Sequence, residues 1–293
     1  MLTLMGPGAI GMAATQVNVF VNTLLATNTV EGAVSWLNYA FRLMYLPIGL
    51  FGVSIATATL PAVSRQSTER DSAAVRQTVS NGLSLMLMLN VPSMIGLIVL
   101  ARPIVRVLLE RGAFTAADTL ATAAALQFYA LGLVGYSVVR ILSPVFYAIG
   151  RNRTPVVVSV LAVLVNASLN FVLVQVLGYR GLALGTSIAA LFNAGTLLYL
   201  LRSHLNGLDE WRLLGAVARI ALASAAMGAT AAVSHAFFEA QFPSPGFAAQ
   251  ALRLGIAIGL AVLVLAAAAW LLRIRELSEG VALVRRRIQR RAR

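Results

Sequence analysis

The chain has 293 residues, of which 59% are hydrophobic and 11% are charged, and its formal net charge is +13. These proportions exclude an ordinary soluble domain, and the absence of cysteine excludes disulfides, thiolate nucleophiles and cysteine metal sites. In an apolar chain the excess of arginine is typical of membrane topology and attraction to lipid headgroups. We therefore expect membrane lipids as partners and no nucleic acid.

Long apolar stretches predict about eight transmembrane helices, because each comes near or above the roughly 18 to 20 residues that cross a bilayer. The expected spans are 5–28, 33–62, 79–101, 119–149, 155–178, 182–202, 214–237 and 250–273. The stretches are continuously apolar, which disfavours transmembrane strands. The predicted fold class is an all-α polytopic membrane protein.

The first expected span contains the polar residues Gln16, Asn18 and Asn22. Pro7 and Gly8 lie only a few residues from the start of the chain, where this span begins, and the chain shows no basic region typical of a signal peptide. This abrupt start leads us to expect a piece of a longer protein.

The second expected span carries a basic residue, Arg42, inside an otherwise apolar stretch. A charge within a span is costly, and a cation kept there usually faces a watery cavity or an anionic ligand. Helical spacing places Ser35, Asn38 and Tyr45 on the same side of the helix as Arg42. Snorkelling to the nearer membrane surface is the alternative, but the distance along the helix is long, roughly 13 Å. We favour the interpretation that Arg42 faces a cavity.

Proline and glycine mark two of the spans. Pro47 and Pro144 lie inside the overlong second and fourth spans, where each can allow a kink. Gly49 and Gly52 predict close packing of the second span against a neighbouring helix.

Between the third and fourth spans, the segment 102–118 predicts a short interfacial helix. The fourth span then carries a second basic residue, Arg140. No aspartate or glutamate lies well inside any expected span. Arginines without buried acidic partners would attract phosphate or carboxylate strongly, and a diphosphate suits guanidinium geometry.

The fifth and sixth spans offer Asn166, Asn170 and Thr186. Hydrogen bonds between helices are the favoured interpretation of such residues in a membrane. Together with Asn22 they are also weak candidates for a sodium site, because they supply oxygen ligands but no carboxylate. We expect no metal site beyond this, and no cofactor.

Basic residues in alternate connections predict the orientation. By the positive-inside rule the C-terminus is cytoplasmic, and the segment from Arg273 onwards predicts a basic helix on the inner membrane surface. The arginines at 102, 106 and 111 run against the rule, which indicates another role or a helix end.

Several segments resemble one family. Ser35–Pro61 (SWLNYAFRLMYLPIGLFGVSIATATLP) resembles a signature segment of the lipid II flippases of the MurJ/MviN family, and RGAFTAAD at 111–118 and PVFY at 144–147 agree with it. The family implies two six-helix lobes around a central cavity, followed by two extra helices. The chain resembles the second lobe (1–205), the extra pair (206–273) and a basic cytoplasmic tail (274–293), without the N-terminal lobe.

The resemblance implies a multi-pass protein of the bacterial inner membrane that flips lipid II, an undecaprenyl-diphosphate-linked precursor, by alternating access. Arg42 matches an arginine that the family needs for transport. The candidate substrate-binding residues are Arg42, Asn38, Tyr45, Ser35, Arg140, Gln16 and Asn18. Family members often carry acidic residues beside or one turn after the arginine, where this chain has Phe41 and Tyr45. The candidate sodium ligands Asn22, Asn166, Asn170 and Thr186 include no carboxylate, which argues against sodium coupling and leaves membrane potential or protons as alternatives.

Two other functions are considered. One is an exporter of another polyprenyl-linked oligosaccharide or of a drug, from the same superfamily of multidrug and polysaccharide exporters. The other is a membrane-embedded glycosyltransferase acting on polyprenyl diphosphates, which would need a carboxylate or histidine in or near a span. His204 and His235 both lie near span ends without catalytic or metal-ligand spacing. A transporter is therefore preferred to an enzyme.

Overall fold

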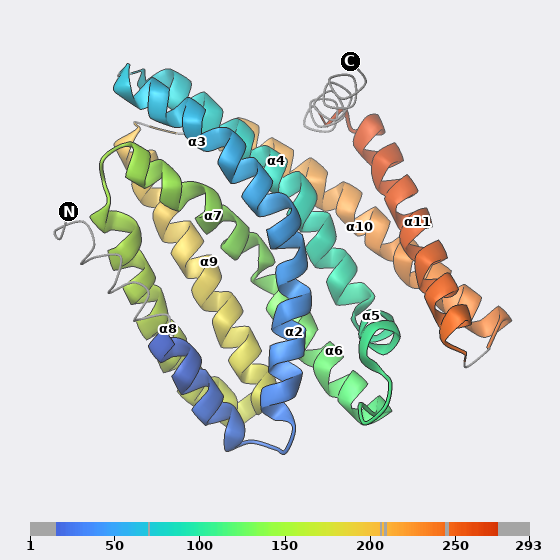
Figure 1. The fold of residues 1–293 in the computed structure, drawn as a ribbon. Helices are drawn as coiled ribbons and strands as arrows, with labels where there is room; N and C mark the ends of the chain where they lie inside the picture. Colours follow the sequence, from blue (N-terminus) through green and yellow to red (C-terminus); the bar gives the residue numbers. More distant parts are fainter. Residues whose placement is uncertain (1–15, 70, 206, 208–209, 244–245, 275–293) are drawn as a thin grey trace, which may run out of the picture.

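The computed structural model describes residues 16–69, 71–205, 207, 210–243 and 246–274, and within these ranges its regular structure is entirely helical (Figure 1). Residues 16–27 form the first helix. The elements that follow are α2 (Ala33–Pro47), the π-helical segment η1 (Ile48–Gly52), α3 (Val53–Thr68), α4 (Ser72–Val99), α5 (Ala101–Leu109), α6 (Ala116–Leu131), α7 (Leu133–Ala148), α8 (Arg153–Leu177), α9 (Tyr179–His204), α10 (Glu210–Gln241) and α11 (Phe247–Leu271). The all-α prediction is confirmed.

Five helices are long and apolar enough to cross a membrane by themselves, namely α4, α8, α9, α10 from Leu214 onwards, and α11. Two bent pairs, α2 with α3 and α6 with α7, raise the number to as many as seven among the described residues. The remaining expected span, 5–28, lies partly outside the described ranges, and so does the tail expected at 274–293 apart from Ile274.

The second expected span bends by 44° between Ala33–Gly52 and Ile55–Thr68. Pro47 has no amide hydrogen to continue the α-helical bonding pattern, so α2 ends there and the π-helical segment begins at the next residue. The kink expected near this proline is therefore present, a few residues beyond it.

The kink expected at Pro144 is wrong in position, because α7 continues through that residue and the 42° bend falls at Gly132. There the amide of Gly132 donates to the Tyr129 carbonyl (2.9 Å). The carbonyl of Phe128 loses the partner that an unbroken α-helix would provide, and Ser187 of α9 donates its hydroxyl to it instead (2.7 Å). A Cβ on Gly132 would lie 2.8 Å from Ser187 Cα, so only glycine allows this approach.

The helices pack around two apolar cores. One joins α3, α4, α7, α8 and α9 through residues such as Met86, Phe146 and Leu197. The other joins α2, α5, α6 and α9 around Met44 and Leu126. α7 and α9 therefore lie side by side in the middle of the bundle, with α2 and α4 beside them (Figure 1).

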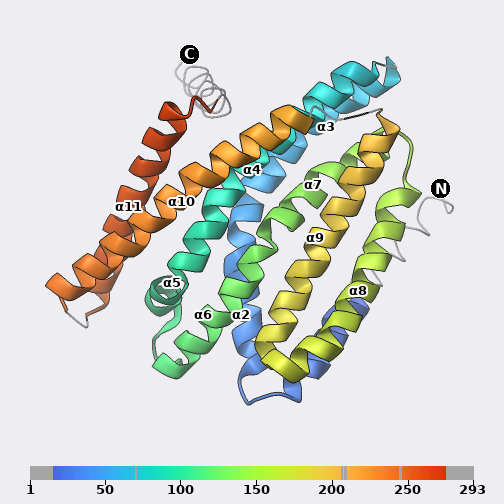
Figure 2. The ribbon, with the colours of Figure 1, turned by 180° about the vertical axis from the view of Figure 1, so that it is seen from behind.

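The last two helices pack against each other, and α10 also packs along α4 (Figure 2). Gly228 makes the second contact close, because a Cβ there would lie 2.5 Å from Ile95 Cγ2. Met88 and Val91 of α4 form a small shared core with Ile220 of α10. The division of the chain into a lobe at 1–205 and an extra pair at 206–273 remains a prediction.

The outer faces of α8 and α11 are apolar and exposed, as shown by Val157, Leu164, Phe171, Leu263 and Trp270. Such broad apolar faces suit a hydrocarbon surrounding. The short helix expected in 102–118 is present as α5, which buries Val105 and exposes Arg102.

Candidate functional site

The polar stripe of α2 lies opposite the packed side of that helix. Ala33, Leu37, Ala40 and Met44 repeat at steps of three and four and are at most 7% exposed. On the other side, Ser35, Asn38 and Arg42 are exposed and Tyr45 is partly buried. Asn38 donates to the Val34 carbonyl of its own helix (2.9 Å).

Arg42 lines an open hollow of about 500 Å³ together with Phe41, Tyr45, Leu46, Gly49 and Leu50. Its guanidinium makes no hydrogen bond or ion pair with any residue that the structure describes. The close packing expected of Gly49 is wrong, because a Cβ there would have no atom within 4 Å. The missing side chain instead leaves space in the hollow, whereas a Cβ added to Gly52 would lie 3.6 Å from Met86 Cε.

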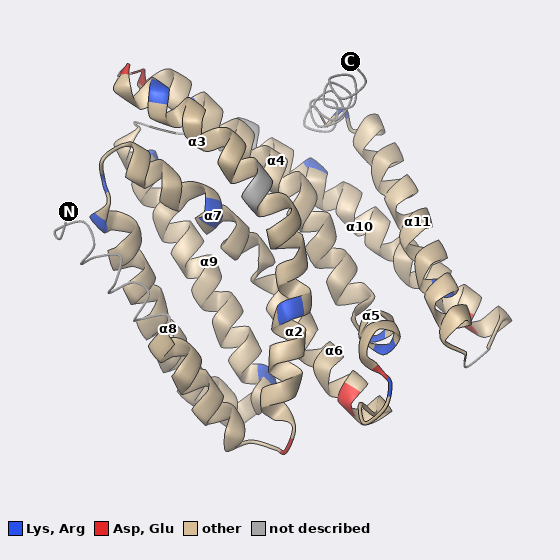
Figure 3. Cartoon of the chain, in the orientation of Figure 1, with Lys and Arg blue, Asp and Glu red and all other residues tan. Residues whose placement is uncertain are grey.

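Arg140 of α7 contacts the same stripe through Tyr45. Its guanidinium donates a hydrogen bond to the Tyr45 hydroxyl, and its Cζ lies 5.7 Å from the centre of the tyrosine ring. The acceptor is a neutral hydroxyl, so the positive charge of Arg140 is not cancelled by it. Tyr45 therefore lines the hollow beside Arg42 and also contacts Arg140, which is not itself among the residues that line the hollow. Figure 3 shows α2 and α7 carrying basic residues away from their ends, whereas most other basic residues lie near helix ends.

An aromatic cluster supports this side of α2. Phe41 stacks on Tyr45 with ring centres 5.7 Å apart. It also meets Tyr129 and Tyr136 edge-on, at 5.5 and 6.1 Å. These contacts hold α2 against α6 and α7, and Phe41 occupies one wall of the hollow.

The candidate sodium ligands also meet, in a second site made of amides. Asn166 Oδ1 accepts from Asn18 (2.7 Å), Asn22 (3.4 Å) and Asn170 (3.0 Å), and Asn166 Nδ2 donates to Thr186 Oγ1 (3.4 Å). Asn170 also donates to Asn22 and is fully buried. Its Oδ1 has no hydrogen-bond partner among the described residues. Residues 16–27, α8 and α9 are thus joined by the interhelical hydrogen bonds expected of such residues.

The remaining candidates lie apart from Arg42. Asn18 belongs to the amide cluster through Asn166, and Gln16 is exposed at the start of the described chain. In the described ranges, no group of three His, Cys, Asp or Glu residues is placed to hold a metal ion.

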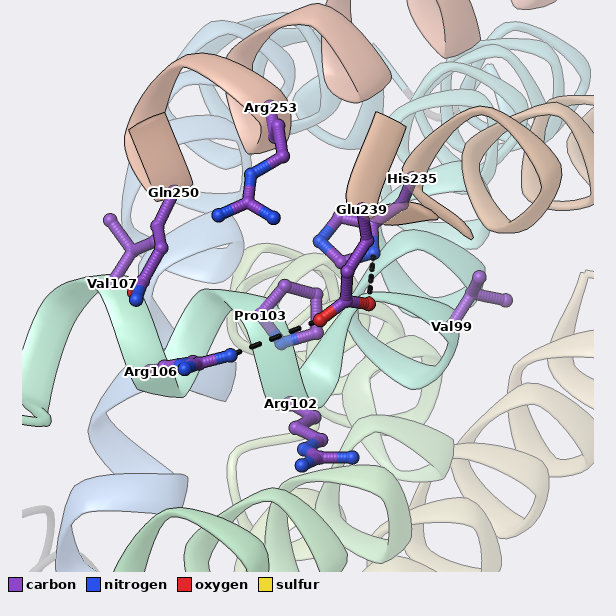
Figure 4. A pocket seen from close by; sticks show the side chains of 9 residues that line it. All are labelled: Val99, Arg102, Pro103, Arg106, Val107, His235, Glu239, Gln250 and Arg253. Carbon is purple, nitrogen blue, oxygen red and sulfur yellow. Dashed lines mark ion pairs between the residues drawn. The ribbon is translucent and has the colours of Figure 1, made fainter. Parts of the chain in front are cut away.

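Sequence reasoning missed a third feature, a pocket between α5, α10 and α11 (Figure 4). It contains Arg102, Arg106 and Arg253 with His235 and Glu239, and its volume is about 220 Å³. The arginines at 102 and 106 run against the positive-inside rule, which marks them in the sequence but not the pocket they line. Their partners come from segments more than 120 residues further along the chain, which no local pattern could identify.

A bundle of bent apolar helices, with a polar stripe that carries Arg42 on one spanning helix and no described carboxylate beside it, is typical of a multi-pass membrane transporter. Comparison with known proteins narrows this class. The family model "Lipid II flippase MurJ" matches residues 1–250, so the chain belongs to the MurJ family.

Individual proteins of this family are also similar to the chain. The probable lipid II flippase MurJ of Vibrio cholerae is 36% identical over 227 residues, covering 77% of this chain and 43% of that protein. The counterpart in Bdellovibrio bacteriovorus is 35% identical over 256 residues, covering 87% of this chain and 48% of that protein. This chain therefore spans less than half the length of these two relatives.

Solved structures show the same fold. A structure of lipid II flippase MurJ in an inward closed conformation superposes with a TM-score of 0.69 and 29% identity, covering 87% of this chain and 51% of that chain. An outward-facing multidrug resistance MATE transporter of the MOP superfamily reaches 0.60 at 16% identity, covering 93% of this chain and 65% of that chain. The second likeness concerns the fold alone.

Proposed function

We propose that this chain forms the second transport lobe of a flippase that moves lipid II across the bacterial cytoplasmic membrane. The observation that carries the proposal is Arg42, a basic residue within a membrane-spanning helix that has no ion-pair partner among the described residues. Arg140 is a second positive charge within a spanning helix, and it contacts Tyr45, one of the residues that line the hollow of Arg42. The diphosphate of a lipid-linked precursor would receive bidentate hydrogen bonds from such guanidinium groups.

The proposed mechanism is alternating access between this lobe and a first lobe that supplies the opposite wall of the cavity. The bends between α2 and α3 and between α6 and α7 support it, because they lie in the two spans that carry Arg42 and Arg140. Arg42 and Arg140 would bind the diphosphate, and Ser35 and Asn38 would offer hydrogen bonds to the sugar-bearing part. Each would act by binding and orienting the lipid, without a covalent step.

The proposed orientation puts the C-terminus in the cytoplasm. Five basic residues would then lie at or next to the cytoplasmic ends of helices, in keeping with the positive-inside rule: Arg65, Arg76, Arg151, Arg153 and Arg202. The proposed location is the inner membrane, with membrane lipids and the first lobe as partners.

The test is rescue of flippase-depleted bacteria by this chain produced together with a first lobe. We expect rescue by the unsubstituted chain, loss of rescue with Arg42→Ala, and partial rescue with Arg42→Lys, which keeps the charge but not the bidentate geometry. Arg180→Ala is the matched control, because Arg180 is exposed at a helix end outside the hollow. Membrane insertion of each variant is measured by immunoblot.

Two results would overturn the proposal. The first is full rescue by a normally inserted Arg42→Ala chain. The second is failure of the inserted unsubstituted chain to rescue while a flipping assay shows transport of another polyprenyl-linked oligosaccharide or of a drug.

A further inference from the structure

The pocket between α5, α10 and α11 lies at the end of the bundle opposite Ile274. α5 follows the last residue of α4, Val99, and lies where α10 ends and α11 begins (Figures 1 and 4). The pocket residue Arg253 of α11 is 21 residues from Ile274, or about 30 Å along a helix, which is near the thickness of a bilayer core. The pocket is therefore at the depth of the lipid headgroups.

The charges around the pocket are mainly positive. Arg102 and Arg106 come from α5 and Arg253 from α11, whereas Glu239 of α10 is the acidic residue in the lining. With histidine counted as neutral, the lining carries three positive charges and one negative charge, and Glu110 next to the lining pairs with Arg106. Arg253 is only 8% exposed, so part of this charge lies in a region of low dielectric, where an anion is attracted strongly.

The present contacts leave hydrogen-bonding capacity unused. Arg106 lies 3.5 Å from Glu110 and 3.8 Å from Glu239, longer than the roughly 2.7–2.9 Å of a charge-assisted hydrogen bond. Its Nε is buried without a hydrogen-bond partner among the described residues. An oxyanion in the pocket could approach Arg106 more closely than the carboxylates of Glu110 and Glu239 do.

Glu239 marks the position that an anion would take. Its carboxylate lies 3.8 Å from both Arg106 and His235, and Figure 4 shows it between these two side chains. The side chain is 53% exposed, so it is not held there by burial. A ligand with more oxygens and a charge fixed at headgroup depth would compete with it for the arginines.

We propose that this pocket binds the phosphodiester headgroup of an anionic phospholipid, in the membrane leaflet at this end of the bundle. Guanidinium groups bind phosphate oxygens in a bidentate manner, and on the cytoplasmic side of other membrane proteins basic pockets between transmembrane helices bind anionic headgroups. Val99, Pro103 and Val107 provide an apolar wall beside the arginines, suited to the glycerol end of the lipid. The lipid would join α5 to the pair α10 and α11.

The experiment measures thermal unfolding of the chain in nonionic detergent while phosphatidylglycerol, phosphatidylcholine or inorganic phosphate is added. We expect phosphatidylglycerol to raise the unfolding temperature at the lowest concentration, phosphate to act only at much higher concentration, and phosphatidylcholine to have little effect. Equal effects of phosphatidylglycerol and phosphatidylcholine would overturn the proposal. Phosphate acting at the same concentration as phosphatidylglycerol would overturn the lipid as the source of the anion.

Variants of the pocket residues should shift the half-maximal phosphatidylglycerol concentration in opposite directions. Arg102→Gln changes an exposed residue and keeps the fold, and Arg253→Gln changes a buried one; each should raise the half-maximal phosphatidylglycerol concentration about tenfold. Glu239→Gln should lower that concentration, because it removes the competing carboxylate. Arg180→Gln is the control, since it removes an exposed arginine that is not in the pocket lining. An unchanged response in Arg102→Gln and Glu239→Gln, or the same loss in Arg180→Gln, would overturn the assignment.

Discussion

Replacing Gly135 by alanine should weaken the contact between α7 and α9 that holds Arg140 in place. An added Cβ would lie 2.7 Å from the carbonyl carbon of Ala190, and 2.8 Å from both its oxygen and the Leu191 nitrogen. Distances under 3.0 Å are essentially never seen for real Cβ atoms. All three neighbours are backbone atoms, so no change of side-chain rotamer relieves the contact and α9 must move.

The size of the effect follows from two opposing terms. Overpacking costs about 1–3 kcal/mol, and rigid backbone neighbours place this site in the upper part of that range. Alanine recovers about 1 kcal/mol relative to glycine within a helix. The net loss of stability for Gly135→Ala is therefore about 1–2 kcal/mol. Gly49→Ala has open space around it and should instead be neutral or stabilising by up to about 1 kcal/mol.

The assay is unfolding of both variants and the unsubstituted chain in the same detergent, followed by circular dichroism. A second measurement is rescue of flippase-depleted cells, which should fall for Gly135→Ala if α9 displaces Arg140 from Tyr45. Equal stability of Gly135→Ala and Gly49→Ala would refute the reasoning, because the two changes are chemically identical and differ only in their neighbours.

Two further changes test the hollow beside Arg42. Tyr45→Phe removes the hydroxyl that accepts from Arg140 but keeps the ring, so stability in a detergent unfolding assay should fall by about 0.6–1 kcal/mol. Tyr136→Phe is its control, because no hydrogen bond of that hydroxyl is found among the described residues; an equal loss in both would argue against the contact. Gly49→Leu should fill the hollow and reduce rescue to the level of an empty vector while the helix content stays unchanged, and Gly49→Ala should retain rescue. Rescue by Gly49→Leu would mean that the hollow is not used.

The spans and the stripe of α2 could be predicted because both depend on the local sequence. A run of apolar residues long enough for a bilayer makes a spanning helix almost regardless of its neighbours. The 3.6-residue period alone places Ser35, Asn38 and Arg42 on one side. The neighbouring residues of α2 also explain why that side is unpacked, since Ala33, Leu37 and Ala40 form the buried side.

Features that depend on distant residues could not be predicted. The bend at Gly132 requires the hydroxyl of Ser187, 55 residues later, whereas Pro144 was the stronger local signal. Pro144 does not end α7, which continues to Ala148 and packs against α4 and α9. Gly49 and Gly52 have the same sequence signal, and only the position of Met86 shows that one is packed and the other is open.

The amide cluster leads to a prediction about sodium. Asn166 Oδ1 already accepts from Asn18, Asn22 and Asn170, so Asn170 Oδ1 is the amide oxygen of the cluster without a described partner, and no carboxylate is present beside it. Sodium prefers several oxygen ligands with negative charge among them. We therefore expect exchange of sodium for potassium at equal ionic strength to leave the unfolding temperature of the chain unchanged.

A variant of the amide cluster tests whether the missing carboxylate is what prevents sodium binding. Asn170 is fully buried, so Asn170→Asp would place a carboxylate where its charge is costly without a cation. This variant should be destabilised in potassium and partly restored by sodium, with a gain of about 2.7 kcal/mol at a sodium concentration one hundred times the dissociation constant. Asn170→Ala is the control and should show no difference between the two ions. A sodium-dependent rise in the unfolding temperature of the unsubstituted chain would show that the amide and hydroxyl oxygens suffice, and that the missing carboxylate is not what decides cation binding here.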